Sequence, residues 1–174
     1  MSFILKYFHW AISLFLSVIF LDSLRYKFTN APETQVIFTE KLNGWAASLG
    51  ADGLFAQTGL FSQYVIGTAE LFASALVLAG AAFGFKRLQG LGALIGLAVM
   101  SGAISFHLFT PLGIDPNNDG GGLFLAACIV WVGSMTMVIM RRKALIGLFT
   151  EIGAALGKRE AKTEENSEAE TATA

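Results

Sequence analysis

The sequence predicts an all-α integral membrane protein, a four-helix bundle with an extracytoplasmic surface helix and a disordered C-terminal tail. Hydrophobic residues fill 54% of the 174 positions and charged residues only 14%, which is more apolar than an ordinary soluble domain. Four stretches are each long enough for a helix to cross ~30 Å of hydrocarbon. Three of them carry ionisable residues, which are costly in lipid and therefore mark candidate functional positions.

The predicted spans cover residues 3–24, 60–83, 88–110 and 123–140. The first resembles a signal peptide because an apolar run follows Lys6. No small-residue cleavage site follows that run, which continues into Asp22 and Arg25, so we expect a retained span. Residues 84–87 form a short connection, so the second and third spans are expected to pack as an antiparallel hairpin.

The loop between the first two spans is expected to form a helix on the outer membrane face, because long structureless loops are uncommon in compact domains. Asn30 is a candidate cap, Pro32 and Glu33 suit a first helical turn, and Gly50 suits the exit. An apolar side that lies over the bundle as a lid is expected from Val36, Ile37, Leu42 and Trp45.

After the fourth span, residues 144–157 are expected to form an amphipathic segment on the membrane surface, with Leu145, Leu148, Phe149 and Ile152 at helical spacing. Residues 158–174 have no apolar anchor, so they cannot bury enough surface to offset the entropy of ordering. We therefore expect a disordered acidic tail.

Basic residues are distributed unequally between the two sides of the predicted membrane domain. Three of them, Arg25, Lys27 and Lys41, lie on one side. The others lie on the opposite side: Lys6, Lys86, Arg87, Arg141, Arg142, Lys143, Lys158, Arg159 and Lys162. The positive-inside rule then predicts that both termini lie in the cytoplasm. The expected location is a bacterial-type inner membrane.

Small and polar residues share one face in each of two spans. Gly92, Gly96, Ala103 and His107 lie within ~60° of one another on a helix, and so do Gly67, Glu70, Ser74 and Ala81. Small residues mark helix contacts, so these faces are expected to turn His107 and Glu70 toward the bundle interior. There Glu70 must be protonated, paired with a cation or open to water.

Three further ionisable residues stand at the outer end of the first span. Asp22 and Arg25 are three residues apart and can pair on one face, while Lys27 points elsewhere. Either Arg25 or Lys27 can partner Glu70. Asp22, Arg25, Lys27, Glu70 and His107 are therefore candidates for ligand binding or proton exchange, with a structural ion pair as the equal alternative.

Other chemistries find less support in the sequence. Cys128 is the single cysteine, so an intrachain disulfide is excluded. Residues 115–120 match half of a calcium loop, but Ala126 stands where a bidentate Glu is required. No zinc, haem or iron–sulfur site can be assembled from two distant histidines, of which His9 reads as an interfacial anchor. No basic stripe with interleaved aromatics indicates nucleic acid as a partner.

Several sequence blocks resemble the DoxX-like family of small membrane proteins. The blocks are residues 21–33 around Lys27-Phe28, 67–71 around Glu70, 101–108 around His107 and the Asp-Gly-Gly of 119–121. The resemblance covers about residues 8–140 and implies a four-helix bundle. It also implies a redox setting with quinone as a candidate ligand, and it carries Lys27, Glu70 and His107 over as site residues.

The sequence leaves three functions open, and we expect no independent catalytic activity. The first is an accessory or quinone-contacting subunit of a redox or oxidative-stress membrane system, in which Glu70 and His107 contact the quinone. The second is a non-catalytic scaffold whose buried charges lock the bundle. A weaker third is small-solute or proton transport by an oligomer. The expected partners are the lipid bilayer, a membrane redox subunit and further copies of the chain.

Overall fold

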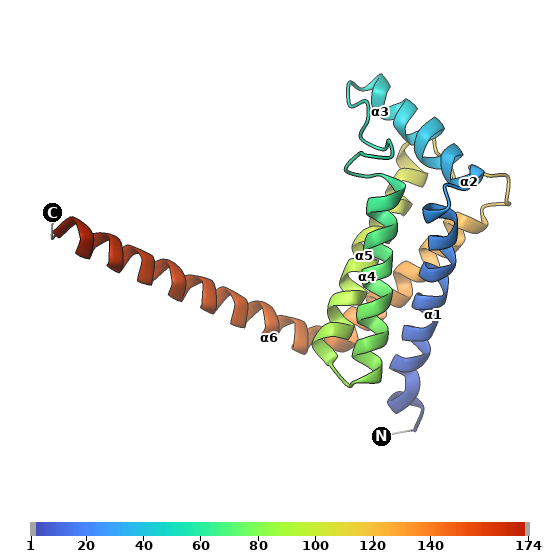
Figure 1. Ribbon diagram of the computed structural model, residues 1–174. Helices are drawn as coiled ribbons and strands as arrows, with labels where there is room; N and C mark the ends of the chain where they lie inside the picture. The colour runs from blue at the N-terminus through green and yellow to red at the C-terminus, as the bar shows by residue number, and fades with distance from the viewer. Residues whose placement is uncertain (1–2, 173–174) are drawn as a thin grey trace.

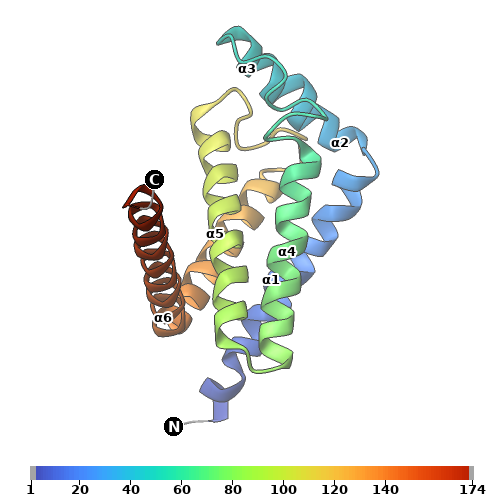
Figure 2. The same ribbon diagram turned by 60° about the vertical axis from the view of Figure 1, so that its left-hand side comes forward.

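The computed structural model describes the backbone of residues 3–172 and the side chains of residues 7–159. This part of the chain contains helices and no strand. Four long helices form a bundle: α1 (Phe3–Phe28), α4 (Gln63–Ala82), α5 (Lys86–Phe109) and α6 (Gly122–Ala172). A shorter helical segment lies across one end of the bundle (Figures 1 and 2). The predicted all-α membrane bundle is confirmed at this level, since each long helix is apolar enough to span a bilayer.

The helix ends depart slightly from the predicted ones. Helix α1 continues to Phe28 instead of ending at residue 24. Asn30, two residues after this end, has a left-handed φ of 59°. Helix α4 begins at Gln63 because the Ser62 hydroxyl caps it, accepting a hydrogen bond of 3.3 Å from the Val65 N–H. The longer α1 carries Lys27 into the bundle, where it reaches Glu70.

Helices α4 and α5 form the predicted antiparallel hairpin (Figure 2). The chain turns between them at Gly84, whose φ of +72° favours glycine. A Cβ at Gly92 would lie 2.7 Å from the Ala73 carbonyl oxygen, and one at Gly96 would lie 3.0 Å from the Phe20 ring. Small residues therefore permit the close contact of α5 with α4 and α1.

The centre of the bundle is packed by apolar side chains from all four long helices. Leu16 and Phe20 of α1 meet Ala73 of α4, Met100 of α5 and Val130 of α6. A second apolar cluster lies nearer the α4–α5 turn, where Val77 and Ala93 contact Met137. The polar groups described below are therefore held by a close-packed apolar framework.

The predicted surface helix is present as three consecutive segments: α2 (Pro32–Gln35), the π-helix η1 (Val36–Asn43) and α3 (Gly44–Ser48). Four buried positions recur at intervals of four: Thr34, Phe38, Leu42 and Ala46. The wider turn of a π-helix keeps residues four apart on one face. That face packs on Phe55, Leu112 and Phe106 as the expected lid. We call this end of the bundle the capped end.

Asn30 does not have the expected capping role. Ala31 precedes α2 and no side chain caps that helix, while Pro32 and Glu33 occupy the first turn as expected. The Asn30 side chain instead accepts hydrogen bonds from three glutamines. Gly50 follows the exit of α3 with a φ of +81°, as the sequence suggested.

Helix α6 differs from the expectation of three separate regions. It is continuous to Ala172, whereas residues 158–174 were expected to be disordered; positions 173 and 174 lie outside the described residues. Its second half extends away from the bundle (Figure 1). The Ala, Glu and Lys residues of this stretch are strong helix formers, so the backbone can be helical without packing on a core. Placement of residues 144–157 on a membrane surface stays a prediction.

Candidate functional site

Glu70 is paired with Lys27 between α4 and α1 near the capped end. The Lys27 Nζ lies 2.9 Å from Oε2 and 3.0 Å from Oε1 of Glu70, and the Ser23 hydroxyl donates to Oε2 at 3.1 Å. Lys27 also bonds the Ser23 oxygen. The side chain of Glu70 is 3% exposed and that of Lys27 is 15% exposed. The acid therefore has a cationic partner and a hydroxyl donor within a protein interior. We call these three residues the Lys27–Glu70 cluster.

Helix geometry explains how the cluster forms. Ser23 and Lys27 are four residues apart on α1, so both point to the same side once the helix continues past residue 24. On α4, the predicted inward face is confirmed, because Gly67, Glu70, Ser74 and Ala81 are all buried. Gly67 leaves room for the lysine stem, whose Cδ lies 3.4 Å from the position of a Cβ there. The aliphatic part of Lys27 thus packs on α4 while its ammonium reaches Glu70.

Asp22 and Arg25 form the pair that their spacing predicted, but this pair is not part of the cluster. The Arg25 Nε lies 3.0 Å from Asp22 Oδ1, and the two side chains are 66% and 60% exposed. Arg25 also donates to the Tyr26 hydroxyl at 2.8 Å and stacks over its ring. Lys27, and not Arg25, is therefore the partner of Glu70.

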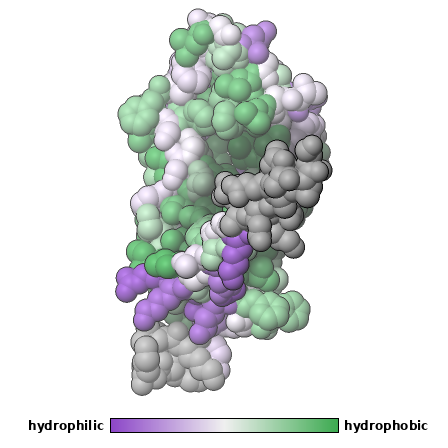
Figure 3. All heavy atoms as spheres, turned by 90° about the vertical axis from the view of Figure 1, so that its left-hand side faces the viewer, coloured by the Kyte–Doolittle hydropathy of each residue, from purple (hydrophilic) through white to green (hydrophobic). Residues whose placement is uncertain are grey.

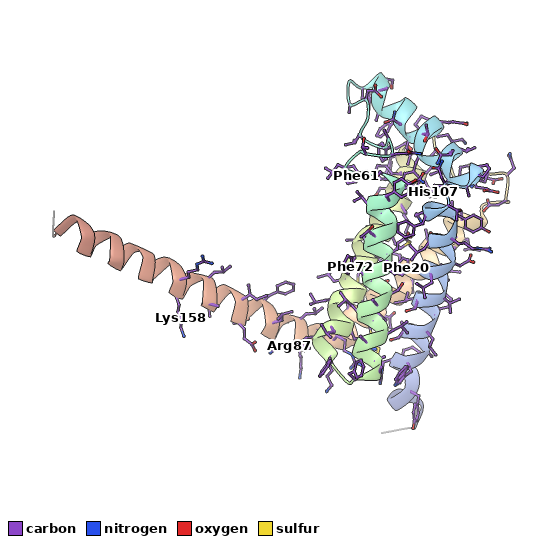
Figure 4. The ribbon with its side chains drawn as sticks, in the orientation of Figure 1. Phe20, Phe61, Phe72, Arg87, His107 and Lys158 are labelled. Carbon is purple, nitrogen blue, oxygen red and sulfur yellow. The ribbon has the colours of Figure 1, made fainter. Side chains whose placement is uncertain are left out.

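His107 is buried on α5 at the capped end (Figure 4), with 5% of its surface exposed. Its Nδ1 lies 2.5 Å from the Gly113 carbonyl oxygen, which can only accept, so Nδ1 carries the hydrogen. The His107 ring packs edge-on against the Phe124 ring, with 5.5 Å between the two ring centroids. The described hydrogen bonds tie His107 to the loop after α5 and do not join it to Glu70. Of the three residues expected to converge, two are in direct contact.

A glutamine network beside the cluster was not foreseen. Gln63 is 1% exposed and its Nε2 donates to the Lys27 carbonyl at 2.8 Å and to Asn30 Oδ1 at 3.0 Å. Gln35 of the lid donates to Gln63 Oε1 at 2.8 Å. The last turn of α1 is therefore held to α2 and α4. The only sequence signal was a glutamine at the start of an apolar span.

A second buried polar group lies at the opposite end of the bundle and was also missed. Gln89 is 1% exposed; its Nε2 donates to Ser13 Oγ at 2.8 Å and lies 3.3 Å from His9 Nδ1. Its Oε1 accepts from Arg141 Nε at 2.7 Å. His9, interpreted from the sequence as an interfacial anchor, is half-buried in this group.

The loop at residues 115–121 is a turn that caps α6. Asp119 Oδ2 accepts from the Leu123 N–H at 2.8 Å and Oδ1 accepts from the Gly121 N–H at 3.0 Å. These hydrogen bonds hold the pKa of Asp119 below its usual value, and the bond from the Leu123 N–H has the largest effect. Asn118 and Gly120 have positive φ, as the turn interpretation requires. Within the described part of the chain, no three His, Cys, Asp or Glu residues group as metal ligands.

The arrangement around Glu70 is closed by protein groups. Both carboxylate oxygens have partners, and neither of the two grooves around Lys86, at the far end of the hairpin, is lined by Glu70. Chemistry at Glu70 would require this ion pair to open first.

Comparison with known proteins assigns no family to the chain. No family model matches it, and neither the curated proteins nor the solved structures contain a match. The established description is that of a small protein with four membrane-spanning helices and bilayer contact. The DoxX-like resemblance stays an expectation from the sequence.

Proposed function

We propose that this chain is a non-catalytic membrane protein, an accessory or scaffolding subunit whose Lys27–Glu70 cluster locks the bundle. One observation carries the proposal: Glu70 is 3% exposed and its carboxylate is fully partnered by Lys27 and Ser23. A group that exchanges protons or contacts a ligand needs a free atom facing a cavity. A charge that locks helices needs the opposite, a satisfied and enclosed environment.

The lock acts at a defined place. It joins the last turn of α1 to the second turn of α4, and the glutamine network adds the lid to the same junction. A bundle that holds its shape there presents a fixed surface to a neighbouring subunit. The exposed apolar residues of the spans supply that surface within the bilayer.

The experiment is the melting temperature of the purified protein with Glu70→Gln. Removal of the carboxylate leaves the Lys27 ammonium without a partner. In a buried pair this lowers the free energy of unfolding by about 3 kcal/mol. The matched control is Asp22→Asn, which breaks an exposed pair at the same end of α1 and should cost less than ~1 kcal/mol. An unchanged melting temperature for Glu70→Gln would remove the locking role.

A second candidate is a quinone-contacting accessory subunit of a redox system. It is supported by the DoxX-like resemblance and by the state of His107, whose Nδ1 is engaged by Gly113, so that Nε2 is left as an acceptor. Binding of ubiquinone or menaquinone analogues to the purified protein tests it. A signal that is lost in His107→Ala and retained in Asp22→Asn would favour it; absence of binding would exclude it.

A further inference from the structure

Two adjoining grooves lie where the α4–α5 turn meets α6, far from the Lys27–Glu70 cluster. The first, of about 390 Å³, is lined by Lys86, Arg141, Arg142 and Lys143 beside the apolar Ile139 and Met140. The second, of about 580 Å³, is mainly apolar, with walls that include Phe85, Leu88, Leu91 and Leu148. Lys86 and Ala144 line both. We call them the cationic groove and the apolar groove.

Arg141 is held in position from inside the bundle. Gln89, buried to 1% exposure, accepts the Nε–H of Arg141 at 2.7 Å and is itself fixed by its bond of 2.8 Å to Ser13. Gly90 lets α6 approach, since a Cβ there would lie 3.2 Å from the Arg141 Cβ. The described side chains engage only Nε, so both terminal amino groups of the guanidinium remain as donors at fixed positions.

Among the residues whose side chains the structure describes, the positive charge around this groove exceeds the negative charge. Five cations stand at this end, namely Lys86, Arg87, Arg141, Arg142 and Lys143. The carboxylate described beside them, Glu151, is engaged by Arg87 through a bond of 2.8 Å from Nη1 to Oε2. Figure 3 shows hydrophilic residues gathered in the lower part of the view, with mostly apolar residues above them. The groove is therefore suited to an anion.

The surrounding apolar surface specifies what kind of anion. Lys86 begins a membrane span and the Arg-Arg-Lys run follows the apolar part of another, so the cationic groove lies at the depth of lipid head groups. Ile139 is 54% exposed and Phe85 is 57% exposed. A free phosphate would use only the cations, whereas a phospholipid would also cover the apolar groove.

We propose that the cationic groove binds the phosphate of an anionic phospholipid and that the apolar groove receives one of its acyl chains. Arg141, positioned by Gln89, donates to the phosphate oxygens, and Lys86, Arg142 and Lys143 supply the surrounding positive charge. The bound lipid joins the α4–α5 hairpin to α6, and this role is independent of the Lys27–Glu70 cluster.

The test is the melting temperature of the detergent-purified protein during titration with phosphatidylglycerol, with phosphatidylcholine and inorganic phosphate as parallel titrants. A ligand that binds only the folded state raises the melting temperature with its concentration. We expect a rise with phosphatidylglycerol that the other two titrants do not reproduce. Equal rises with the two lipids, or an equal rise with inorganic phosphate, would overturn the assignment.

Matched variants locate the site. The double variant Arg142→Gln/Lys143→Gln should weaken the apparent affinity for phosphatidylglycerol about 30-fold, since each cation near the headgroup is worth about fivefold. The control Lys41→Gln/Lys158→Gln removes the same charge elsewhere and should stay within about twofold of the unmodified protein. Equal losses in both doubles would overturn the groove as the site.

The variant Arg141→Lys tests whether the positioned guanidinium binds the lipid or whether net positive charge alone attracts it. It keeps the charge but loses the planar fork and the Nε bond to Gln89. We expect an affinity loss of about fivefold relative to the unmodified protein. An unchanged affinity would show that net charge alone attracts the lipid and would overturn the role of Arg141.

Discussion

At the scale of single residues, the buried and exposed ion pairs of α1 have different energetic meanings. The Arg25–Asp22 pair is more than half exposed, so water screens it and it contributes little. Lys27 and Glu70 are enclosed, and each is costly without the other. The members of the two pairs that lie on α1, Asp22, Arg25 and Lys27, fall within six residues of one another, so the two pairs can be compared directly.

Replacement of both members of the enclosed pair should be tolerated better than replacement of one. In Lys27→Met/Glu70→Leu no charge is left without a partner, and apolar groups of similar size fill the space. We expect most of the stability lost in Glu70→Gln to return, as measured by denaturant or thermal unfolding. A double variant that is less stable than both single variants would contradict this.

Asp119 gives a pH-dependent prediction, since its pKa is lowered by the backbone bonds at the start of α6. A group with a lowered folded-state pKa stabilises the protein above its unfolded-state value, near 3.8. This contribution is lost as the pH falls through the folded-state pKa.

Asp119→Ala removes the cap and should cost about 1 kcal/mol at pH 7. The melting temperatures of the variant and the unmodified protein should converge as the pH is lowered below about 4. A gap that stays constant over this pH range would show that the carboxylate charge is unimportant.

At the scale of helices, two glycines of α5 differ in what surrounds them. A Cβ at Gly92 would meet the Ala73 carbonyl at 2.7 Å, whereas one at Gly102 would meet nothing within 4 Å. The helix therefore has one face in contact with α4 and another with free space. Small residues are required only on the first.

Gly92→Ala should destabilise the bundle by about 1–3 kcal/mol, because α4 and α5 must separate to admit the methyl group. Gly102→Ala, on the same helix, should be neutral or slightly stabilising. Unfolding of both variants in parallel checks the pair. Equal losses would place the effect in the helix backbone and not in the α4–α5 contact.

Much of the arrangement of the helices could be predicted from the sequence. The apolar spans, the short hairpin turn and the inward face of α4 follow from length and a 3.6-residue period, so Glu70 could be placed inside. The choice of Lys27 over Arg25 depended on where α1 ends. That end is followed by the left-handed Asn30 and is held by Gln63 of α4, which donates to the Lys27 carbonyl. The π-helix and the Gln89–Arg141 bond arise from tertiary packing, which a single sequence does not reveal.

At the scale of the whole molecule, the two ends of the bundle differ in charge and in covering. One end is closed by the lid, and the other carries the cationic groove. Four spans place both termini on the same side of a membrane, and the excess of basic residues predicts that this side is the cytoplasm.

Cysteine labelling tests this orientation in a Cys128→Ser background. In intact cells, the Lys158→Cys variant should be protected from a membrane-impermeant thiol reagent. The Glu33→Cys variant, in the lid, should be labelled. Both sites are exposed on the protein, so accessibility reports the side of the membrane. The reverse labelling pattern would invert the predicted topology.

The most direct measurement of the central claim is a double-mutant cycle of unfolding free energies for Lys27→Met, Glu70→Gln and their combination. If the pair locks α1 to α4, the cycle gives a coupling energy of about 1–3 kcal/mol in favour of the native pair. Additive losses, with a coupling near zero, would show that the two charges act independently and would contradict the proposed lock.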